Sequence, residues 1–195
     1  MGMFNLPLDH SIYVQARGFQ KTAELANTKQ GGMICLTAVI TCAAFASELY
    51  LKCLILLETG QLMKGEHNLR KLFSKLPDDT QQRVERTFNA ITAPRFQNSD
   101  DFYGARQPKS FRDALKHGAE AFINWRYIYE ANQTDFFALF SLPKILCDMI
   151  DERKPAWKHF NPQLVRVEKT QSTSLVLKTQ EPTDGAWPIQ LIGDR

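Results

Sequence analysis

The chain has 195 residues, a length that supports one buried core with a modest appendage. Hydrophobic residues make up 44% of it and charged residues 23%, values that are ordinary for a globular protein and exclude wholesale disorder. The net charge of +3 is too small for a protein covered in basic residues, so any contact with nucleic acid must be local.

The first third of the chain predicts two long helices. Apolar residues recur every three or four positions over residues 11–28, which gives a helix with one apolar stripe. Residues 33–59 are apolar nearly all round, as expected for a helix at the centre of a bundle, and Gly60 follows where a C-terminal cap belongs. Inside this second helix Glu48 and Lys52 are four residues apart, so the two charges can neutralise each other in a buried position.

Residues 30–47 carry no charge and approach the length of a membrane-spanning helix. Threonine, serine and alanine dilute this stretch, and no aromatic belt or flanking cluster of positive charge follows it. We therefore predict a buried core helix and no membrane contact. The N-terminus lacks the pattern of a signal peptide, which predicts a cytoplasmic protein.

The cysteines and histidines of the sequence do not gather in a ligand pattern. None of the cysteines forms a C-x-x-C pair, and the four histidines are scattered. Buried free thiols in a reducing compartment explain the cysteines best, because such thiols behave as small hydrophobic groups. The sequence thus predicts no metal site and no cofactor.

The middle of the chain predicts two shorter helices and a long loop. Residues 67–76 form one helix, which Pro77 ends, and residues 80–91 form the next. Residues 93–109 contain two prolines and a glycine, which forbid a continuous helix and make this the longest loop of the core.

A further helix is predicted over residues 110–131, beginning with a capping box of Ser110 and Asp113. Its apolar stripe has spacings of three and four residues and consists of Phe111, Leu115, Gly118, Phe122, Trp125 and Tyr129. The next helical region covers residues 134–151, where Pro143 either kinks a helix or stands in the first turn of one that begins there.

Helical periodicity disappears from residue 155 onward, and proline, threonine, serine and charged residues dominate. We therefore divide the chain into a helical bundle domain, residues 1–154, and a C-terminal extension, residues 155–195. The extension is predicted to be loosely ordered or a marginal β-hairpin. Deletion of residues 162–195 is expected to leave the bundle folded.

Two short motifs follow each other along these helices: FASELYLK at residues 45–52 and GEHNLRKLF at residues 65–73. In this order they resemble the HEPN superfamily, in which a helix with a spaced glutamate and lysine precedes a turn and a helix that opens with histidine. The resemblance covers about residues 32–131. It implies an all-α, antiparallel helical bundle and an RNA- or nucleotide-associated module of a prokaryotic stress, defence or toxin-type system.

Arg112 and His117 form a pattern similar to the R-x(4-6)-H signature of HEPN ribonucleases, which implies the catalytic pair of a metal-independent endoribonuclease. A histidine can take the proton of a 2′-hydroxyl, and an arginine can stabilise charge on the phosphorane. In a straight helix, five residues separate the two side chains by about 140°, so they converge only across a second subunit or in a non-ideal first turn. The alternative is structural, with Asp113 as a cap partner, Arg112 solvated and His117 beside the core.

Further residues are predicted to contact a substrate. Arg126 follows Arg112 by fourteen residues, nearly on the same side of the predicted helix, so the two could hold a phosphate together. The loop at 93–109 mixes cations and aromatic residues, as required for stacking single-stranded bases, and its candidates are Tyr103, Arg106 and Lys109. The alternatives are surface ion pairs for the arginines and aromatic residues that pin the loop to its domain.

Structural roles are predicted for Glu48, Lys52, Trp125 and His67. For His67 the resemblance implies a turn histidine that caps or bridges a helix pair. The resemblance also implies a homodimer and a cognate antitoxin or other partner protein. The apolar helix at 33–59 supports the dimer, because a small monomer struggles to cover it. The competing interpretation of the whole chain is a non-catalytic dimerisation or interaction domain.

Overall fold

The computed structural model describes residues 6–27, 35–96, 108, 110–130 and 137–159. By its contacts the chain divides into two units, Met1–Val165 and Arg166–Arg195, and all described residues belong to the first. The described part contains seven α-helices and no strand, which confirms the all-α prediction there. The predicted hairpin or loosely ordered extension lies outside the described residues, apart from its first five, and the predicted boundary at residue 154 stays a prediction.

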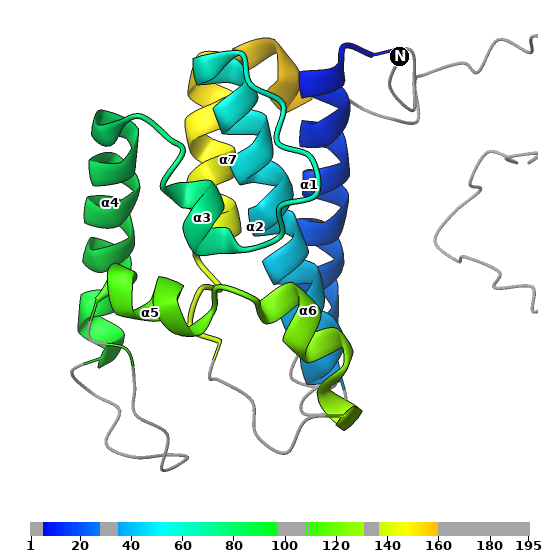
Figure 1. Cartoon of the computed structure of the whole chain (residues 1–195), viewed down its shortest axis with the longest axis vertical. Helices are drawn as coiled ribbons and strands as arrows, with labels where there is room; N and C mark the ends of the chain where they lie inside the picture. Colours follow the sequence, from blue (N-terminus) through cyan, green and yellow to red (C-terminus); the bar gives the residue numbers. More distant parts are fainter. Residues whose placement is uncertain (1–5, 28–34, 97–107, 109, 131–136, 160–195) are drawn as a thin grey trace, which may run out of the picture. The chain divides into compact units, whose positions relative to one another are not determined.

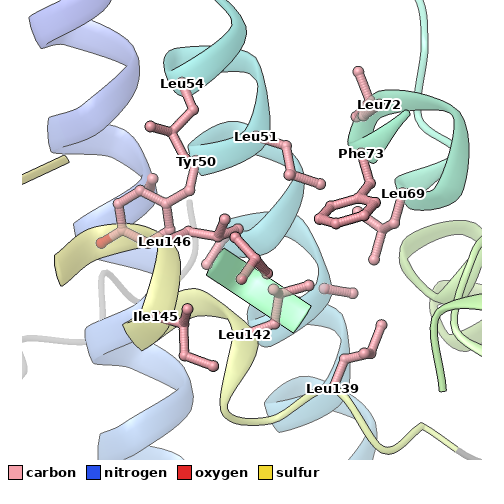
Figure 2. Close-up of a cluster of buried hydrophobic side chains, with 14 of the residues drawn as sticks. Tyr50, Leu51, Leu54, Leu69, Leu72, Phe73, Leu139, Leu142, Ile145 and Leu146 are labelled. Atoms are coloured by element: carbon pink, nitrogen blue, oxygen red, sulfur yellow. The ribbon is translucent and has the colours of Figure 1, made fainter. Parts of the chain in front are cut away.

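The central helix of this unit is α2 (Leu36–Thr59). It packs against α1 (Leu8–Ala26), with which it runs antiparallel, and against α3 (Leu69–Phe73), α6 (Ala121–Arg126) and α7 (Leu142–Arg153), as Figure 1 shows. The face that meets α7 and α3 is lined by large side chains without solvent exposure (Figure 2). These core residues are Tyr50, Leu51 and Leu54 of α2, with Leu69, Leu72, Leu142 and Leu146 opposite.

The burial of α2 confirms the predicted core helix. This helix is long and apolar enough to cross a membrane, but 67% of its most apolar stretch is buried inside the bundle. Because the chain's own helices cover α2, its apolar surface no longer argues for a dimer. The homodimer and the cytoplasmic location both stay predictions.

Some helix boundaries follow the local sequence signals closely. The helix α2 ends at Thr59, and Gly60 has the left-handed φ of 71° that its capping position requires. Asn68 caps α3, since its side chain accepts a hydrogen bond from the Lys71 backbone N–H at 3.0 Å. Pro143 stands in the first turn of α7, which confirms the second of the two roles predicted for it.

The fourth helix, α4 (Asp78–Phe96), is longer than predicted, so the start of the loop at residue 93 was wrong. The proline at position 94 falls in the last turn, where its missing N–H deletes a single helical hydrogen bond and little helix remains to be disrupted. The rest of the predicted loop, except residue 108, lies outside the described residues.

The single helix predicted over residues 110–131 was also wrong. The chain forms α5 (Phe111–His117), breaks at residues 118–120 and continues as α6, followed by a 3-10 turn at Ile128–Glu130. Phe111 and Leu115 are buried and Phe122 and Trp125 pack against the core, but Tyr129 is 77% exposed. The stripe therefore reaches the core only as far as Trp125, because the break changes the direction of the chain.

The break at residues 118–120 is stabilised by contacts with residues from other parts of the fold. The backbone carbonyl of Ala119 accepts a hydrogen bond from the N–H of Leu69 at 2.8 Å, so this turn is tied to the start of α3. A Cβ atom added to Gly118 would lie 2.8 Å from Cδ1 of Leu139 and 3.2 Å from the carbonyl oxygen of Ala114. The glycine thus leaves room for a leucine that packs directly on the end of α5.

We expect Gly118→Ala to destabilise the protein by about 1–3 kcal/mol, because the added methyl group overpacks a buried contact with Leu139. Equilibrium unfolding in urea measures this difference. The same change in a Leu139→Ala background should cost less, since the clashing atom is then absent. An equal cost in both backgrounds would contradict the steric explanation.

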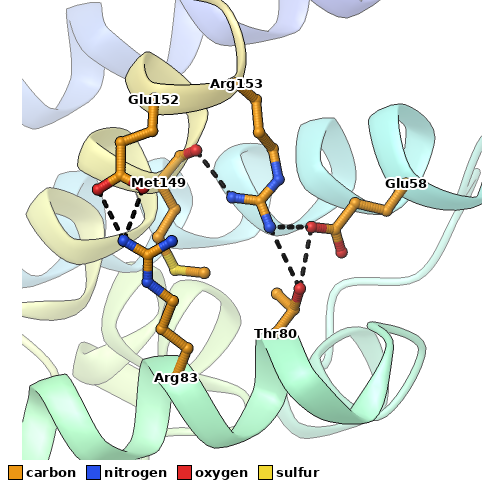
Figure 3. Close-up of polar contacts among 6 residues, drawn as sticks. All are labelled: Glu58, Thr80, Arg83, Met149, Glu152 and Arg153. Atoms are coloured by element: carbon orange, nitrogen blue, oxygen red, sulfur yellow. Dashed lines mark hydrogen bonds and ion pairs between the residues drawn. The ribbon is translucent and has the colours of Figure 1, made fainter.

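One polar network joins α2, α4 and α7 (Figure 3). Glu58 of α2 accepts hydrogen bonds from the Thr80 hydroxyl of α4, at 2.9 Å, and from the Arg153 guanidinium of α7. Arg153 also donates to the Thr80 hydroxyl oxygen at 3.2 Å. Nearby, Arg83 of α4 makes an exposed double hydrogen bond to Glu152 at 2.6–2.7 Å. The network fixes α4, and α4 in turn positions α5.

The chain after α7 continues as a 3-10 helix, Pro155–His159, that packs against the bundle. The indole of Trp157 stacks on the imidazole of His10, with the ring centroids 4.6 Å apart and the planes 3° from parallel. It also lies 5.4 Å from the ring of Tyr13. These contacts attach the end of the described chain to the N-terminal half of α1.

Candidate functional site

The predicted catalytic pair lies on α5, whose start is fixed by its neighbours. Ser110 caps the helix by accepting a hydrogen bond from the N–H of Asp113 at 3.2 Å, as the capping box predicts. The N–H of Phe111 donates to the Asn89 side chain of α4 at 2.9 Å, and the Phe111 ring is buried. The first turn of α5 is therefore fixed both by its own cap, Ser110, and by Asn89 of α4.

Arg112 faces α4 and α3. Its Nε donates to a carboxylate oxygen of Glu85 at 2.8 Å, and its guanidinium lies 5.2 Å from the centre of the Phe73 ring. About half of the side chain, 52%, remains exposed. The terminal nitrogens of the guanidinium make no hydrogen bond within the described part of the chain, so Arg112 has an ordered position and unused donors.

His117 stands at the other end of the helix, with 37% of its side chain exposed. Its Nε2 lies 3.6 Å from a carboxylate oxygen of Asp113, one helical turn earlier. Asp113 therefore contacts the His117 imidazole through its carboxylate and the cap residue Ser110 through its backbone N–H. Arg112 thus pairs with Glu85 and His117 with Asp113, two different carboxylates, in keeping with their separation of five residues.

The placement of Arg126 beside Arg112 on one helix was wrong. That inference needed a continuous helix, and the break at 118–120 removes the common axis. Arg126 instead ends α6, where its guanidinium lies 5.0 Å from the ring centre of Phe122 and 4.6 Å from that of Tyr127. The other predicted substrate contacts, Tyr103, Arg106 and Lys109, lie outside the described residues.

Glu48 is the most deeply buried charged group of the described chain, with 1% of its side chain exposed. Lys52 donates to its Oε1 at 2.7 Å and is itself only 11% exposed, so the predicted pair forms. The Nδ1 of His67 lies 3.0 Å from the same oxygen and thereby bridges α2 to the segment before α3. The other oxygen, Oε2, is buried and has no hydrogen-bond partner in the described part.

The segment that carries His67 is ordered by its own hydrogen bonds. The carboxylate of Glu66 accepts the backbone N–H groups of Asn68 at 2.9 Å and His67 at 3.1 Å. The bond from Asn68 is the main reason that the pKa of Glu66 lies below its ordinary value. The His67 backbone therefore has a defined position, although part of the ring faces solvent.

This segment meets the turn between α5 and α6. Beside the backbone bond from Leu69 to Ala119, the amide of Asn68 donates to the Glu120 carboxylate at 3.3 Å. The ring of Phe122, just after the turn, has its centre 6.2 Å from that of His67. The sequence did not predict this contact between the His67 segment and the turn. The only sequence feature that pointed to a turn there was a glycine, Gly118, within the predicted helix.

Comparison with known proteins does not assign a family or a function to the chain. No protein family, curated protein or solved structure matches the chain. The likeness to HEPN proteins thus rests on the order of its motifs, and the roles it implies stay proposals.

Three other kinds of site, a metal site, a reactive thiol and a groove, find less support in the described chain. Within the described ranges, His, Cys, Asp and Glu side chains form no group of three that could hold a metal ion. Burial raises the pKa of the Cys53 thiol to about 12, as expected for a thiol that acts as a small hydrophobic group. A groove of about 520 Å³ runs along α1 and α7, but its Lys144 is paired with Asp148 at 2.7 Å and its residues lie on neither α3, α5 nor α6.

Proposed function

We propose that this chain is an RNA-associated helical module that cleaves RNA without a metal ion, with Arg112 and His117 as its catalytic pair. The observation that carries the proposal is the pairing of a partly exposed His117 with Asp113, on the same short helix that holds Arg112 against Glu85. A solvent-accessible imidazole beside a carboxylate suits proton transfer near neutral pH. The held guanidinium, with its terminal donors unused, suits binding of a phosphate.

The two residue types meet the two requirements of the reaction. Cleavage by the 2′-hydroxyl needs a group that removes its proton, a role for His117. It also needs positive charge at the phosphorane, a role for Arg112. Because they pair with different carboxylates and stand five residues apart, the two side chains would act on one phosphate across a homodimer or after a change of the Arg112 rotamer.

The biological setting of the proposal comes from the resemblance. It is a cytoplasmic stress, defence or toxin-type system in which the chain dimerises and a cognate antitoxin or other protein controls it. Light scattering at micromolar concentration tests the dimer, and a 22 kDa species alone would argue against it.

We expect the purified protein to cleave single-stranded RNA in the presence of EDTA and to leave 2′,3′-cyclic phosphate ends. Arg112→Ala and His117→Ala should each lower the rate by about 10²–10⁴, the usual effect of losing a positioned catalytic group. Arg112 is about half exposed and His117 is partly exposed, and neither belongs to the buried core, so the melting temperature should change by only a few degrees. Gel electrophoresis of end-labelled oligonucleotides measures the rate.

Arg83→Ala is the matched control, because Arg83 also makes an exposed ion pair but lies in the contact between α4 and α7. Its rate should equal that of the wild type. Unchanged rates in the Arg112 and His117 variants would refute the assignment of the pair, and absence of cleavage by the wild type would refute the ribonuclease. The result would then favour the second candidate, a non-catalytic interaction domain.

One observation favours that second candidate specifically. Arg112 already makes an ion pair with Glu85 and stacks on Phe73, contacts that join α5 to α4 and α3 without any substrate. In this alternative the module acts through its surface, which includes the exposed Tyr127 and Tyr129 after α6. Tyrosine and arginine together are frequent at the centres of protein interfaces.

A further inference from the structure

We infer that His67 is a second catalytic histidine of the same site, and that it donates the proton to the leaving 5′-oxygen when His117 accepts the proton of the 2′-hydroxyl. The inference rests on the proposed ribonuclease function and adds a residue to which the sequence assigns only a structural role. It follows from the hydrogen bonds of His67, from its position beside the turn after α5, and from the neighbouring Arg126.

The hydrogen bonds of His67 leave one ring nitrogen ready for chemistry. Glu48 is charged in its pair with Lys52, and a charged carboxylate only accepts hydrogen bonds, so Nδ1 of His67 must carry the proton in the 3.0 Å contact. Nε2 has no hydrogen-bond partner within the described chain, and 42% of the side chain is exposed. A buried carboxylate that orients a histidine through Nδ1 and leaves Nε2 open is the arrangement used in acid–base catalysis.

A purely structural role explains these contacts less well. Lys52 already neutralises Glu48, so the histidine is not needed to balance the buried charge. Oε2 of Glu48 is nevertheless buried and has no hydrogen-bond partner within the described residues. Unsatisfied buried groups of this kind require an explanation, and a catalytic role for the residues they support is one of the recognised ones.

The fold brings His67 and His117 to the same turn. The backbone bond between Leu69 and Ala119 joins the two segments two residues after each histidine, and the side-chain bond from Asn68 to Glu120 reinforces it. In Figure 1 the turn between α5 and α6 passes directly beneath α3. We call the meeting of these two segments the junction. His67 and His117, each beside a carboxylate, thus lie on the two segments that it joins.

Arg126 supplies a positive charge at this junction. Its guanidinium stacks on the face of Phe122, and the same ring lies beside the imidazole of His67. The predicted phosphate-binding role of Arg126 is therefore kept in this inference, but beside His67, with which it shares the Phe122 ring as a neighbour, and not beside Arg112. A guanidinium stacked on aromatic rings keeps its in-plane donors available for a phosphate.

The reaction balances without a metal or a co-reactant. His117 accepts the 2′-hydroxyl proton as the 2′-oxygen bonds to phosphorus, and the P–O5′ bond breaks with its electron pair on the 5′-oxygen. Protonated His67 gives its Nε2 proton to that oxygen. The products are a 2′,3′-cyclic phosphate and a 5′-hydroxyl, and exchange with water restores both histidines.

The test uses His67→Asn, because the asparagine amide can replace Nδ1 as a donor to Glu48 but cannot transfer a proton. We expect an unchanged melting temperature and a loss of about 10²–10⁴ in the rate of RNA cleavage. A matched oligonucleotide with sulfur in place of the 5′-oxygen separates the two histidines, because a thiolate leaves without being protonated. His67→Asn should cleave this substrate at nearly the wild-type rate, whereas His117→Ala should stay slow.

Three other outcomes are possible, and each of them refutes a different part of the proposal. If the wild type cleaves RNA and His67→Asn matches it, the second histidine is refuted and the proposed function stands. If the variant is slow on both substrates at an unchanged melting temperature, the role as general acid is refuted. If the wild type cleaves neither substrate, the proposed function fails and this inference fails with it.

Discussion

Glu48→Ala is expected to destabilise the protein by about 3–5 kcal/mol, because it leaves Lys52 as an almost fully buried cation without its partner. The variant also removes the hydrogen bond from His67, so the segment before α3 loses one of its contacts with the central helix. We expect a lower urea midpoint in equilibrium unfolding, with the slope of the transition unchanged.

The control for the destabilisation of Glu48→Ala is the double variant Glu48→Leu with Lys52→Met. Replacing both members of a buried ion pair by apolar side chains of similar volume is often neutral or stabilising, because no charge has to be removed from water. The double variant should therefore recover most of the stability that Glu48→Ala loses. Equal destabilisation in both variants would mean that the packing at position 48, and not its charge, determines stability.

The same double variant also bears on catalysis. It keeps His67 but removes the carboxylate that orients the ring. If His67 is a proton donor, RNA cleavage should fall even though the protein is stable. A stable double variant with full cleavage would contradict the role assigned to the contact between Glu48 and His67.

Phe111→Ala is expected to destabilise the protein by about 3–5 kcal/mol, the usual cost of deleting a fully buried phenyl group. The ring of Phe111 lies 4.9 Å from that of Phe73 and 5.1 Å from that of Phe88, so it joins α5 to both α3 and α4. Its exposure is zero, and the cavity left behind would be lined by side chains that cannot all move to fill it. Urea unfolding measures the loss.

Two control variants accompany this prediction. Phe111→Leu keeps most of the buried volume and should cost clearly less than alanine. Tyr129→Ala removes an aromatic residue of the same predicted stripe that is 77% exposed, and we expect no measurable change in its unfolding midpoint. Similar losses at positions 111 and 129 would show that the predicted stripe, and not the observed break at 118–120, describes the core.

The sequence by itself determined the elements whose signals are local. The apolar run of α2, the left-handed Gly60 at its end and the pairing of Glu48 with Lys52 all depend on residues a few positions apart. Such patterns act within one helix, so they predict its existence, its end and its internal ion pair before the rest of the chain is known. The placement of Pro143 in a first turn was likewise one of the alternatives that the sequence offered.

The tertiary structure alone decided where the candidate site lies. The apolar spacing over 110–131 is compatible with one helix, and its division into α5 and α6 depends on the contact of Gly118 with Leu139 and the bond from Leu69 to Ala119. Those partners are about twenty to fifty residues away in the sequence, so no local pattern contains them. The break separates Arg126 from Arg112, and the bond joins the segment of His67 to the turn after His117. Periodicity predicts which side of a helix faces inward, but the position of one helix relative to another follows from packing between distant residues.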